Sequence, residues 1–318
     1  MRVLITGGAG RLGIQACKAF HQNGFDVRLM DVKTSRTLKR IKNLSDKIQI
    51  VWGDITDKGS IRNAMKDIDA VVHMAVIMSP LIHENPELGK KVNVEGTKNI
   101  VEIIKEKGGS LPFVYTSSVA VFGPKSDTGD FLVSEKDEPK PKGIYAETKY
   151  QGEIEIRKSG IDYVILRLAS GWHLTLERSD IAYMYNTPLK APIEVFHPDD
   201  GIRAILNSMN KFNAVKGDTM IISSGPKCRI LHKDRVEVFL NILGFPMPPV
   251  GRFATEQVNI SWYDTTRSQE LLDYQRCTFA DYIDNYTDEL KRRYSPFFIP
   301  LMRYFIGPVF GKFIIRFM

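Results

Sequence analysis

The chain has 318 residues, 43% of them hydrophobic and 25% charged, which is ordinary for a folded globular protein with one large core or a core and a smaller companion. Its three cysteines (Cys17, Cys228, Cys277) and six histidines are scattered without metal-ligand spacing, which argues against a disulfide framework or a metal site. The formal net charge is +7, but residues 291–318 hold six basic and no acidic residues, so the body is near neutral. We therefore expect no nucleic-acid partner.

Short β-rich runs alternate with helical patterns through the first 170 residues. The chain opens on a strand at 3–5 rather than on a secretory signal, which together with the cysteine usage predicts a cytoplasmic protein. An amphipathic helix over 12–20 follows, and Gly24 ends it. Further strands are expected at 27–30, 48–52, 70–74, 113–116 and 163–168. Strands separated by helices predict an α/β fold with a doubly wound parallel sheet of the Rossmann kind.

A glycine-rich turn, Thr6-Gly-Gly-Ala-Gly-Arg-Leu-Gly13, joins the first strand to the first helix. Glycine allows a tight turn and the close approach of a pyrophosphate, while the helix N-terminus offers N–H donors. The turn fits both G-x-G-x-x-G and T-G-x-x-G-x-x-G. The expected dinucleotide contacts here are Gly7, Gly10, Arg11, Leu12 and Gly13.

Two acidic residues follow the next strands. Asp31 ends the second strand, where a carboxylate accepts the ribose hydroxyls of an adenosine and repels a 2′-phosphate, which favours NAD over NADP. Lys33 and Arg36 nearby would attract a phosphate and weaken that preference. Asp54, with Ile55 after it, is placed to meet the adenine edge, although Gly-Asp is also an ordinary turn.

Tyr145 and Lys149 lie one turn apart on one face of a predicted helix that starts near residue 144. An adjacent cation lowers the pKa of a tyrosine and fits it for acid–base chemistry near neutral pH. The spacing is common by chance, but the fifth strand ends on Ser117 and Ser118 at the sheet edge where ligands bind. We therefore expect a catalytic site of Ser118, Tyr145 and Lys149, with Ser117 as the alternative hydroxyl. The Pro-, Asp- and Lys-rich stretch 124–142 is expected to be a long loop beside it.

In order and spacing these motifs resemble the extended short-chain dehydrogenase/reductase superfamily, in particular the NAD-dependent epimerase/dehydratase branch that includes UDP-glucose 4-epimerase. The resemblance covers residues 1–170 strongly and 190–290 weakly. It also rests on His73-Met-Ala75, Val92-Asn-Val-Glu-Gly-Thr97 and Val121-Phe-Gly123.

The resemblance implies a role for each site residue. Tyr145 would exchange a proton with the substrate oxygen as hydride moves to or from the nicotinamide of NAD, and Ser118 would hydrogen-bond the same oxygen. Lys149 would bind the nicotinamide ribose. Asn93 and the backbone at Ala75 would line the cofactor groove.

Three segments depart from the sugar-nucleotide members of that family. Residues 167–172 read Arg-Leu-Ala-Ser-Gly-Trp instead of an arginine followed by asparagine or proline, no arginine stands at 193–196, and 255–259 lack the Arg-x-Gly-Asp element. The hydride chemistry is untouched by these absences, but the assignment of a nucleotide sugar is weakened.

After residue 168 the pattern loosens, with helices expected near 200–209 and 232–243. We expect an NAD-binding domain at 1–170, a substrate-binding portion at 171–294 interleaved with the sheet, and a hydrophobic basic tail at 295–318. Charges interrupt the tail before any apolar run reaches about 18 residues, which disfavours a spanning helix. Its aromatic and basic residues are typical of an interfacial segment on anionic lipid at the cytoplasmic face. Packing on the body or on a second subunit of a homodimer is the alternative.

Three functions follow from these patterns. The leading one is an NAD-dependent epimerase, dehydratase or dehydrogenase acting at a secondary alcohol or ketone of a small molecule, most often a nucleotide sugar. A steroid- or isoprenoid-like alcohol is the alternative substrate, because of the apolar tail and the missing arginines. A non-catalytic NAD-binding sensor is disfavoured because Tyr145 and Lys149 are both present, and a peripheral membrane protein is the third reading.

Overall fold

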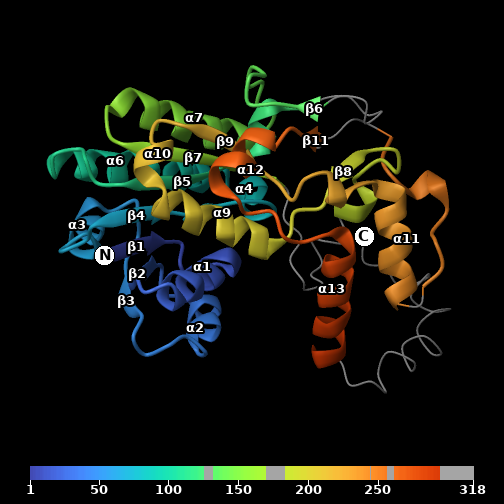
Figure 1. The fold of residues 1–318 in the computed structure, drawn as a ribbon, viewed down its shortest axis with the longest axis horizontal. Helices are drawn as coiled ribbons and strands as arrows, with labels where there is room; N and C mark the ends of the chain where they lie inside the picture. Colours follow the sequence, from blue (N-terminus) through green and yellow to red (C-terminus); the bar gives the residue numbers. More distant parts are fainter. Residues whose placement is uncertain (125–131, 170–182, 244, 256–260, 294–318) are drawn as a thin grey trace.

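The centre of the molecule is a parallel sheet with helices on both faces (Figure 1). The computed structural model describes residues 1–124, 132–169, 183–243, 245–255 and 261–293. The sheet has seven strands in the order β3-β2-β1-β4-β5-β7-β9, and each neighbouring pair is parallel. These strands are β1 (Arg2–Thr6), β2 (Asp26–Asp31), β3 (Gln49–Trp52), β4 (Ala70–His73), β5 (Phe113–Ser118), β7 (Tyr163–Leu168) and β9 (Thr219–Ile222). The expected doubly wound α/β fold is confirmed.

Side chains of the buried strands point alternately to the two faces of the sheet, and each face has its own hydrophobic core. Val3 and Ile5 of β1 pack in a cluster with Phe20 of α1 (Arg11–Gln22), whereas Leu4 packs with Ile100 of α6 (Thr97–Glu106). One face is covered by α1 and α9 (Pro198–Asn210), and the other by α3 (Lys58–Ala64), α6 and α7 (Ile144–Ser159). Because successive side chains of a strand point to opposite faces, a strand buried on both sides reads as a continuous apolar run.

The strand order reverses direction at β1, which lies between β2 and β4. In open α/β sheets the crevice at such a reversal, beyond the carboxyl ends of the strands, is where ligands bind. The glycine turn follows β1, and Asp31 ends β2, so both lie at this point. Gly24 takes a left-handed backbone (φ +83°) just after α1 and ends that helix as expected.

A second lobe lies at the right of Figure 1. It contains the antiparallel pair β8 (Pro192–Glu194) and β10 (Arg229–Leu231) with α11 (His232–Leu243) and α13 (Phe279–Arg293). The helices expected near 200–209 and 232–243 are confirmed as α9 and α11. The segment after residue 170 both builds this lobe and contributes β9, a strand that was not expected from the sequence.

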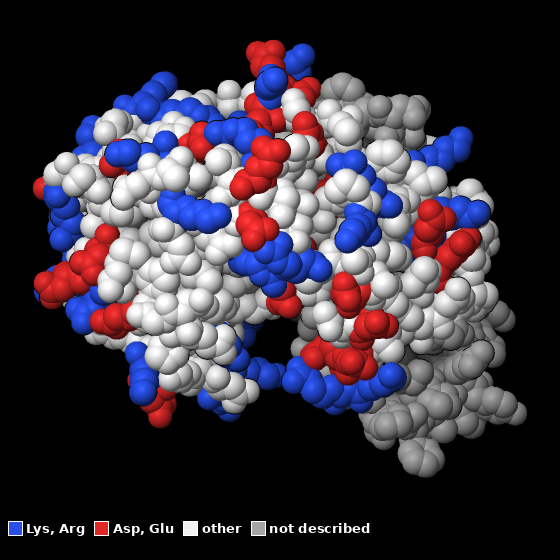
Figure 2. Space-filling model, viewed as in Figure 1, with Lys and Arg blue, Asp and Glu red and all other residues white. Residues whose placement is uncertain are grey.

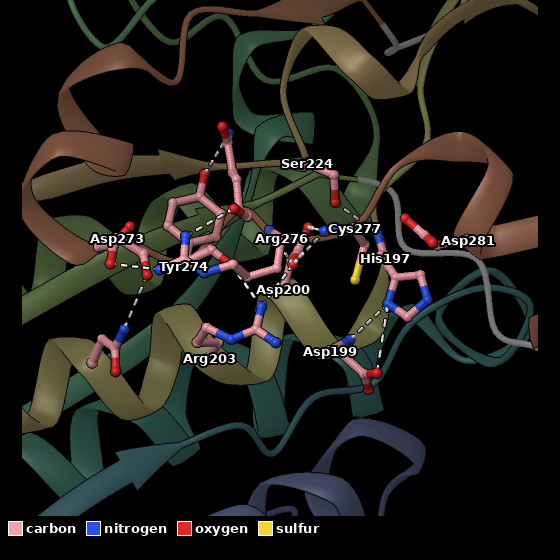
Figure 3. Close-up of polar contacts among 12 residues, drawn as sticks. His197, Asp199, Asp200, Arg203, Ser224, Asp273, Tyr274, Arg276, Cys277 and Asp281 are labelled. Atoms are coloured by element: carbon pink, nitrogen blue, oxygen red, sulfur yellow. Dashed lines mark hydrogen bonds and ion pairs between the residues drawn. The ribbon is translucent and has the colours of Figure 1, made fainter.

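Asp200, on α9, anchors the connection between the two parts (Figure 3). Its buried carboxylate accepts hydrogen bonds from Nη1 of Arg203 at 2.8 Å and from the backbone N–H of Arg276 at 3.0 Å. His197 caps the start of α9, because its Nδ1 accepts the N–H of Asp199 at 3.2 Å, and its Nε2 lies 3.1 Å from the amide of Asn285 on α13. The contact between His197 and Asn285 ties α9 of the main part to α13 of the second lobe, and the contact between Asp200 and Arg276 holds the segment that leads into α13.

A short third pairing corrects the expectation of one long loop over 124–142. Within that stretch β6 (Leu132–Val133) pairs in parallel with β11 (Trp262–Tyr263), while 125–131 lie outside the described residues. The remaining elements are α2 (Ser35–Ile41), α4 (Leu81–Glu84), α5 (Pro86–Lys90), η1 (Lys91–Gly96), η2 (Val119–Phe122), α10 (Phe212–Val215), η3 (Pro226–Cys228), η4 (Val250–Arg252) and α12 (Thr266–Leu272).

Lysine and arginine are interspersed with aspartate and glutamate over the face shown in Figure 2. A notch opens there between the part that carries α1 and α2 and the part that carries α13, with side chains of both signs on its rim. Among the described helices, none has the length and apolar character needed to cross a bilayer. The tail at 295–318 lies outside the described residues.

Candidate active site

The glycine turn has no room for side chains at Gly7 and Gly13. Gly7 has a left-handed backbone (φ +69°), and a Cβ built on it would lie 2.6 Å from the Cα of Ala75. A Cβ on Gly13 would overlap the carbonyl oxygen of Gly7. Gly10 is the N-cap of α1 and donates its N–H to Gly7 O at 2.9 Å, so Arg11 and Leu12 begin the helix directly beside the turn. The N-terminus of α1 therefore meets the turn without a side chain in between, as an anionic diphosphate requires.

Asp31 lies beside this turn and is partly buried. Its Oδ2 accepts the N–H of Ala9 at 2.9 Å, and its Oδ1 accepts the N–H of Val32 at 2.8 Å. Burial raises the pKa of Asp31, whereas the two backbone hydrogen bonds and the charge of Arg40 oppose the rise. Arg40, on α2, also donates to the carbonyl of Ala9 at 3.4 Å. A cation that the sequence analysis did not name thus lies near the acid expected to select NAD.

Asp54 and Ile55, also expected near the adenosine, differ from each other in exposure. Asp54 is exposed, and its Oδ1 accepts the N–H of Thr56 at 2.8 Å, as in an ordinary turn. Ile55 is buried, and its side chain fills the space where Gly96 of η1 would carry a Cβ. Their proposed contacts with an adenine stay predictions.

The two serines at the end of β5 point in different directions. Ser117 is buried and donates its Oγ–H to Oε1 of Glu153 on α7 at 2.6 Å. Ser118 instead accepts the N–H of Ala120 at 3.2 Å, and its side chain lies close enough to Tyr145 to lower the pKa of that phenol. The structure therefore brings Ser118, and not Ser117, to the tyrosine.

The environment of Tyr145 differs from the one expected. Burial raises the pKa of Tyr145, and the neighbouring Ser118 side chain lowers it only in part. The expected lowering by Lys149 is not seen, because the Lys149 Nζ lies over the ring of Tyr115, 4.1 Å from its centroid. The phenol is thus the favoured form at neutral pH in the protein alone.

Lys149 is almost completely enclosed, with 3% of its surface exposed. Burial lowers the pKa of this ammonium to about 7, and the charge of Glu153 acts against that fall. His73, at the end of β4, is also buried, and its ring nitrogens lie 2.6 Å from Thr6 Oγ1 and 3.0 Å from Thr97 Oγ1. Burial lowers the pKa of His73 to about 3, so its imidazole is neutral.

Asn93 holds the segment after β4 against the helix that carries Tyr145. It lies in the π-helical turn η1 and is 1% exposed. Its Oδ1 accepts the N–H of Ile77 at 2.7 Å, while its Nδ2 donates to the carbonyl of Ile77 at 2.9 Å and to Thr148 Oγ1 at 3.0 Å. The side chain is therefore held by protein groups, and its contact with a cofactor stays a prediction.

Glu153 was missed by the sequence analysis, although a signal was present. It lies four residues after Lys149, which continues the i, i+4 series of the helix. Arg167 interrupts the otherwise apolar strand β7, and a buried arginine requires an acidic partner. The partner is Glu153, at 2.8 Å.

The sequence analysis found no arginine at 193–196, but the second lobe contains arginines farther along the chain. Arg229, on β10, pairs with the buried carboxylate of Glu194 at 2.9 Å. Arg235, on α11, is 3% exposed, and its guanidinium lies 5.2 Å from the ring centroid of Tyr183.

Comparison with known proteins identifies a family to which the first half of the chain is similar. The model of the NAD dependent epimerase/dehydratase family matches residues 3–172. D-erythronate dehydrogenase of Cupriavidus necator is 31% identical over 179 residues, 53% of this chain and 54% of that protein. The 3 beta-hydroxysteroid dehydrogenase type 7 of Rattus norvegicus is 30% identical over 139 residues, 43% of this chain and 41% of that protein. The match to this chain thus spans about half the length of these curated relatives or less.

The fold is shared with solved epimerases. UDP-glucuronic acid 4-epimerase from Bacillus cereus, in complex with UDP-glucuronic acid and NAD, superimposes with a TM-score of 0.78 over 92% of this chain and 100% of that one, at 21% identity. That identity supports the fold alone. The family model, however, matches more than half of the sequence, and the chain therefore belongs to the NAD-dependent epimerase/dehydratase family, enzymes of the extended short-chain dehydrogenase/reductase superfamily.

Proposed function

We propose that the protein is an NAD-dependent oxidoreductase that moves hydride at a secondary alcohol or ketone carbon, with Tyr145, Ser118 and Lys149 as its catalytic residues. The observation that carries the proposal is the meeting of Ser118 and Tyr145 at the carboxyl end of β5, with Lys149 one helical turn away. This end of the sheet is also where the glycine turn leaves β1.

The residues at the turn fit a dinucleotide. Gly7 and Gly13 leave a space that any Cβ would close, and the N-terminus of α1 opens onto it. Each oxygen of Asp31 accepts one backbone N–H and keeps a further lone pair for a ribose hydroxyl. When bound, NAD would supply the hydride acceptor or donor at its nicotinamide ring.

Tyr145 would act as the acid–base group. In the reductive direction its phenol donates a proton to the carbonyl oxygen, and in the oxidative direction its phenolate removes the proton from the alcohol. The Ser118 hydroxyl would hold the same oxygen at the tyrosine. Lys149, when protonated, would stabilise the phenolate and bind the ribose next to the nicotinamide.

A nucleotide sugar is the substrate class that we propose first. The epimerase from Bacillus cereus that shares the fold was solved with UDP-glucuronic acid. An apolar secondary alcohol is the second candidate, favoured by two exposed apolar side chains, Met78 (51%) and Leu81 (42%). They follow Ile77, whose backbone is held by Asn93 next to α7.

A substrate screen separates these candidates. Purified protein with NAD is incubated with UDP-glucose, UDP-glucuronic acid or a 3β-hydroxysteroid, while NADH absorbance and sugar isomers are followed. Isomerisation without net NADH supports the sugar-nucleotide epimerase, whereas stoichiometric NADH with the steroid supports the dehydrogenase. Tyr145→Phe is the control in each assay. Turnover that survives this substitution would refute the proposed roles, and NAD binding without turnover of any alcohol would favour a sensor.

A further inference from the structure

A buried carboxylate lies directly behind the candidate active site. Glu153 is on α7, one turn after Lys149 and two turns after Tyr145, and its side chain is fully enclosed. Its partners come from β5, from β7 and from α7 itself. The residue therefore connects the strand that carries Ser118 to the helix that carries the tyrosine and the lysine.

Four donors surround this carboxylate. Oε1 accepts Ser117 Oγ–H at 2.6 Å and Arg167 Nε–H at 3.0 Å, while Oε2 accepts Nη2 of Arg167 at 2.8 Å and Nη2 of Arg157 at 2.8 Å. A carboxylate has about four lone-pair sites, so the described donors fill its capacity. Burial alone would raise the pKa of Glu153, but hydrogen bonds from Arg167 and Ser117 and the charges of the two arginines bring it below its usual range. The group is thus an anion at neutral pH.

The contact to Ser117 constrains its neighbour in the chain. Adjacent residues of a strand point to opposite faces, so fixing Ser117 toward α7 also fixes the direction of Ser118. Arg167 adds a second restraint, since its guanidinium lies 4.8 Å from the ring centroid of Phe122, in the turn that follows Ser118. Both restraints end on Glu153.

We propose that Glu153 is a positioning residue of this site: it fastens the end of β5 to α7 through Ser117 and Arg167, and it places a fixed negative charge one helical turn from the Lys149 ammonium. The inference rests on the proposed function. It assigns Glu153 no contact with substrate or cofactor.

Glu153→Gln tests the charge, and Glu155→Gln on the same helix is the matched control. Glu155 is partly exposed and accepts a hydrogen bond from Gln151 Nε2 at 3.0 Å, away from the two arginines. NAD affinity is measured by calorimetry between pH 6 and 9, without any substrate. In Glu153→Gln, Lys149 loses the charge that favours its protonated form, so the pH at which NAD affinity declines should fall by about one unit. Glu155→Gln should follow the wild type, and Glu153→Asp should move the decline back toward it.

Ser117→Ala tests the positioning separately and covers the case in which Glu153→Gln does not fold. It keeps every charge, so the NAD titration should stay at the wild-type pH while kcat with UDP-glucose, or with the alcohol that the screen identifies, falls about tenfold or more. A purely structural ion pair would give a lower Tm for Glu153→Gln with a titration like that of the wild type, and that result would overturn the inference.

The variants distinguish a failure of the role proposed for Glu153 from a failure of the proposed function. If Tyr145→Phe is inactive while Glu153→Gln and Ser117→Ala match the wild type in titration and in kcat, only the role of Glu153 is rejected. Full activity of Tyr145→Phe would instead reject the catalytic assignment.

Discussion

Replacing Gly7 by alanine tests whether the glycine turn is shaped by backbone crowding as the structure indicates. The new Cβ would lie 2.6 Å from both the Cα and the backbone N of Ala75, closer than real Cβ atoms come, and the residue has a left-handed backbone at φ +69°. Gly24→Ala is the matched control, because Gly24 has φ +83° but open space around its Cβ position. The two variants share the conformational strain and differ in the contact with the backbone of Met74 and Ala75, directly after β4.

The expected costs follow from that difference. A left-handed backbone costs an alanine about 1–2 kcal/mol, so Gly24→Ala should lower the free energy of unfolding by roughly that amount. Gly7→Ala adds overpacking of about 1–3 kcal/mol, and its cost should come to about 2–5 kcal/mol. Since β1 and β4 must separate at the turn to relieve the contact, the NAD dissociation constant should rise by about tenfold or more, which corresponds to about 1.4 kcal/mol.

Urea unfolding and calorimetric titration with NAD measure these two quantities. Gly24→Ala should bind NAD like the wild type. If Gly7→Ala loses no more stability than Gly24→Ala and binds NAD normally, then the turn is not crowded by the backbone that follows β4 and the reasoning fails.

Four further predictions concern the site and the tail. Tyr145→Phe should lower kcat by about a hundredfold or more, because it removes the acid–base group, while NAD affinity by calorimetry stays near the wild-type value; equal loss of both would point to misfolding. Asp31→Ala should weaken NAD binding by about tenfold and raise the NADP-to-NAD preference in the same titration, because the ribose acceptor and the repulsion of a 2′-phosphate are both lost; an unchanged preference would place selectivity elsewhere. In the protein without cofactor, folding lowers the pKa of Lys149 from 10.5 to about 7. Between pH 7 and 10.5 the unfolded chain therefore binds more protons than the folded one, and the contribution of Lys149 to the free energy of unfolding rises with pH. Urea titrations of Lys149→Met across this pH range should lack that rise. If residues 295–318 bind anionic lipid, the full chain should co-sediment with vesicles that contain it and the chain without 295–318 should not; if the tail instead holds a second subunit, the same deletion should turn a dimer into a monomer in size-exclusion chromatography.

Most of the sheet was predictable because its signals are local. The six strands expected from the sequence are present as β1 to β5 and β7, and each expected run lies within about two residues of the observed bounds. β9 was not expected, because Thr219–Ile222 is short and lies in the segment after residue 170 where the alternation of strands and helices has loosened.

The motifs of the site were visible in the sequence, but the partners of their side chains were not. Tyr145 and Lys149 share a helix, so their spacing alone places them on one face. Lys149 rests on the ring of Tyr115 from β5, and Asn93 is held by Ile77 and Thr148. Each of these contacts joins residues on different elements, and no pattern along a single helix or strand encodes it.

The sequence by itself determined the alternation of strands and helices, the glycine turn and the one-turn spacing of Tyr145 and Lys149, because periodicity and backbone freedom act over a few residues. The sequence favoured Ser118 and kept Ser117 as the alternative, but only the tertiary structure gave the physical reason. The buried carboxylate of Glu153, 36 residues beyond Ser117 in the chain, accepts the Ser117 hydroxyl, whereas Ser118 lies near Tyr145. The direction in which the pKa of Tyr145 moves was decided in the same way, because desolvation depends on the packing of elements that are distant in the chain.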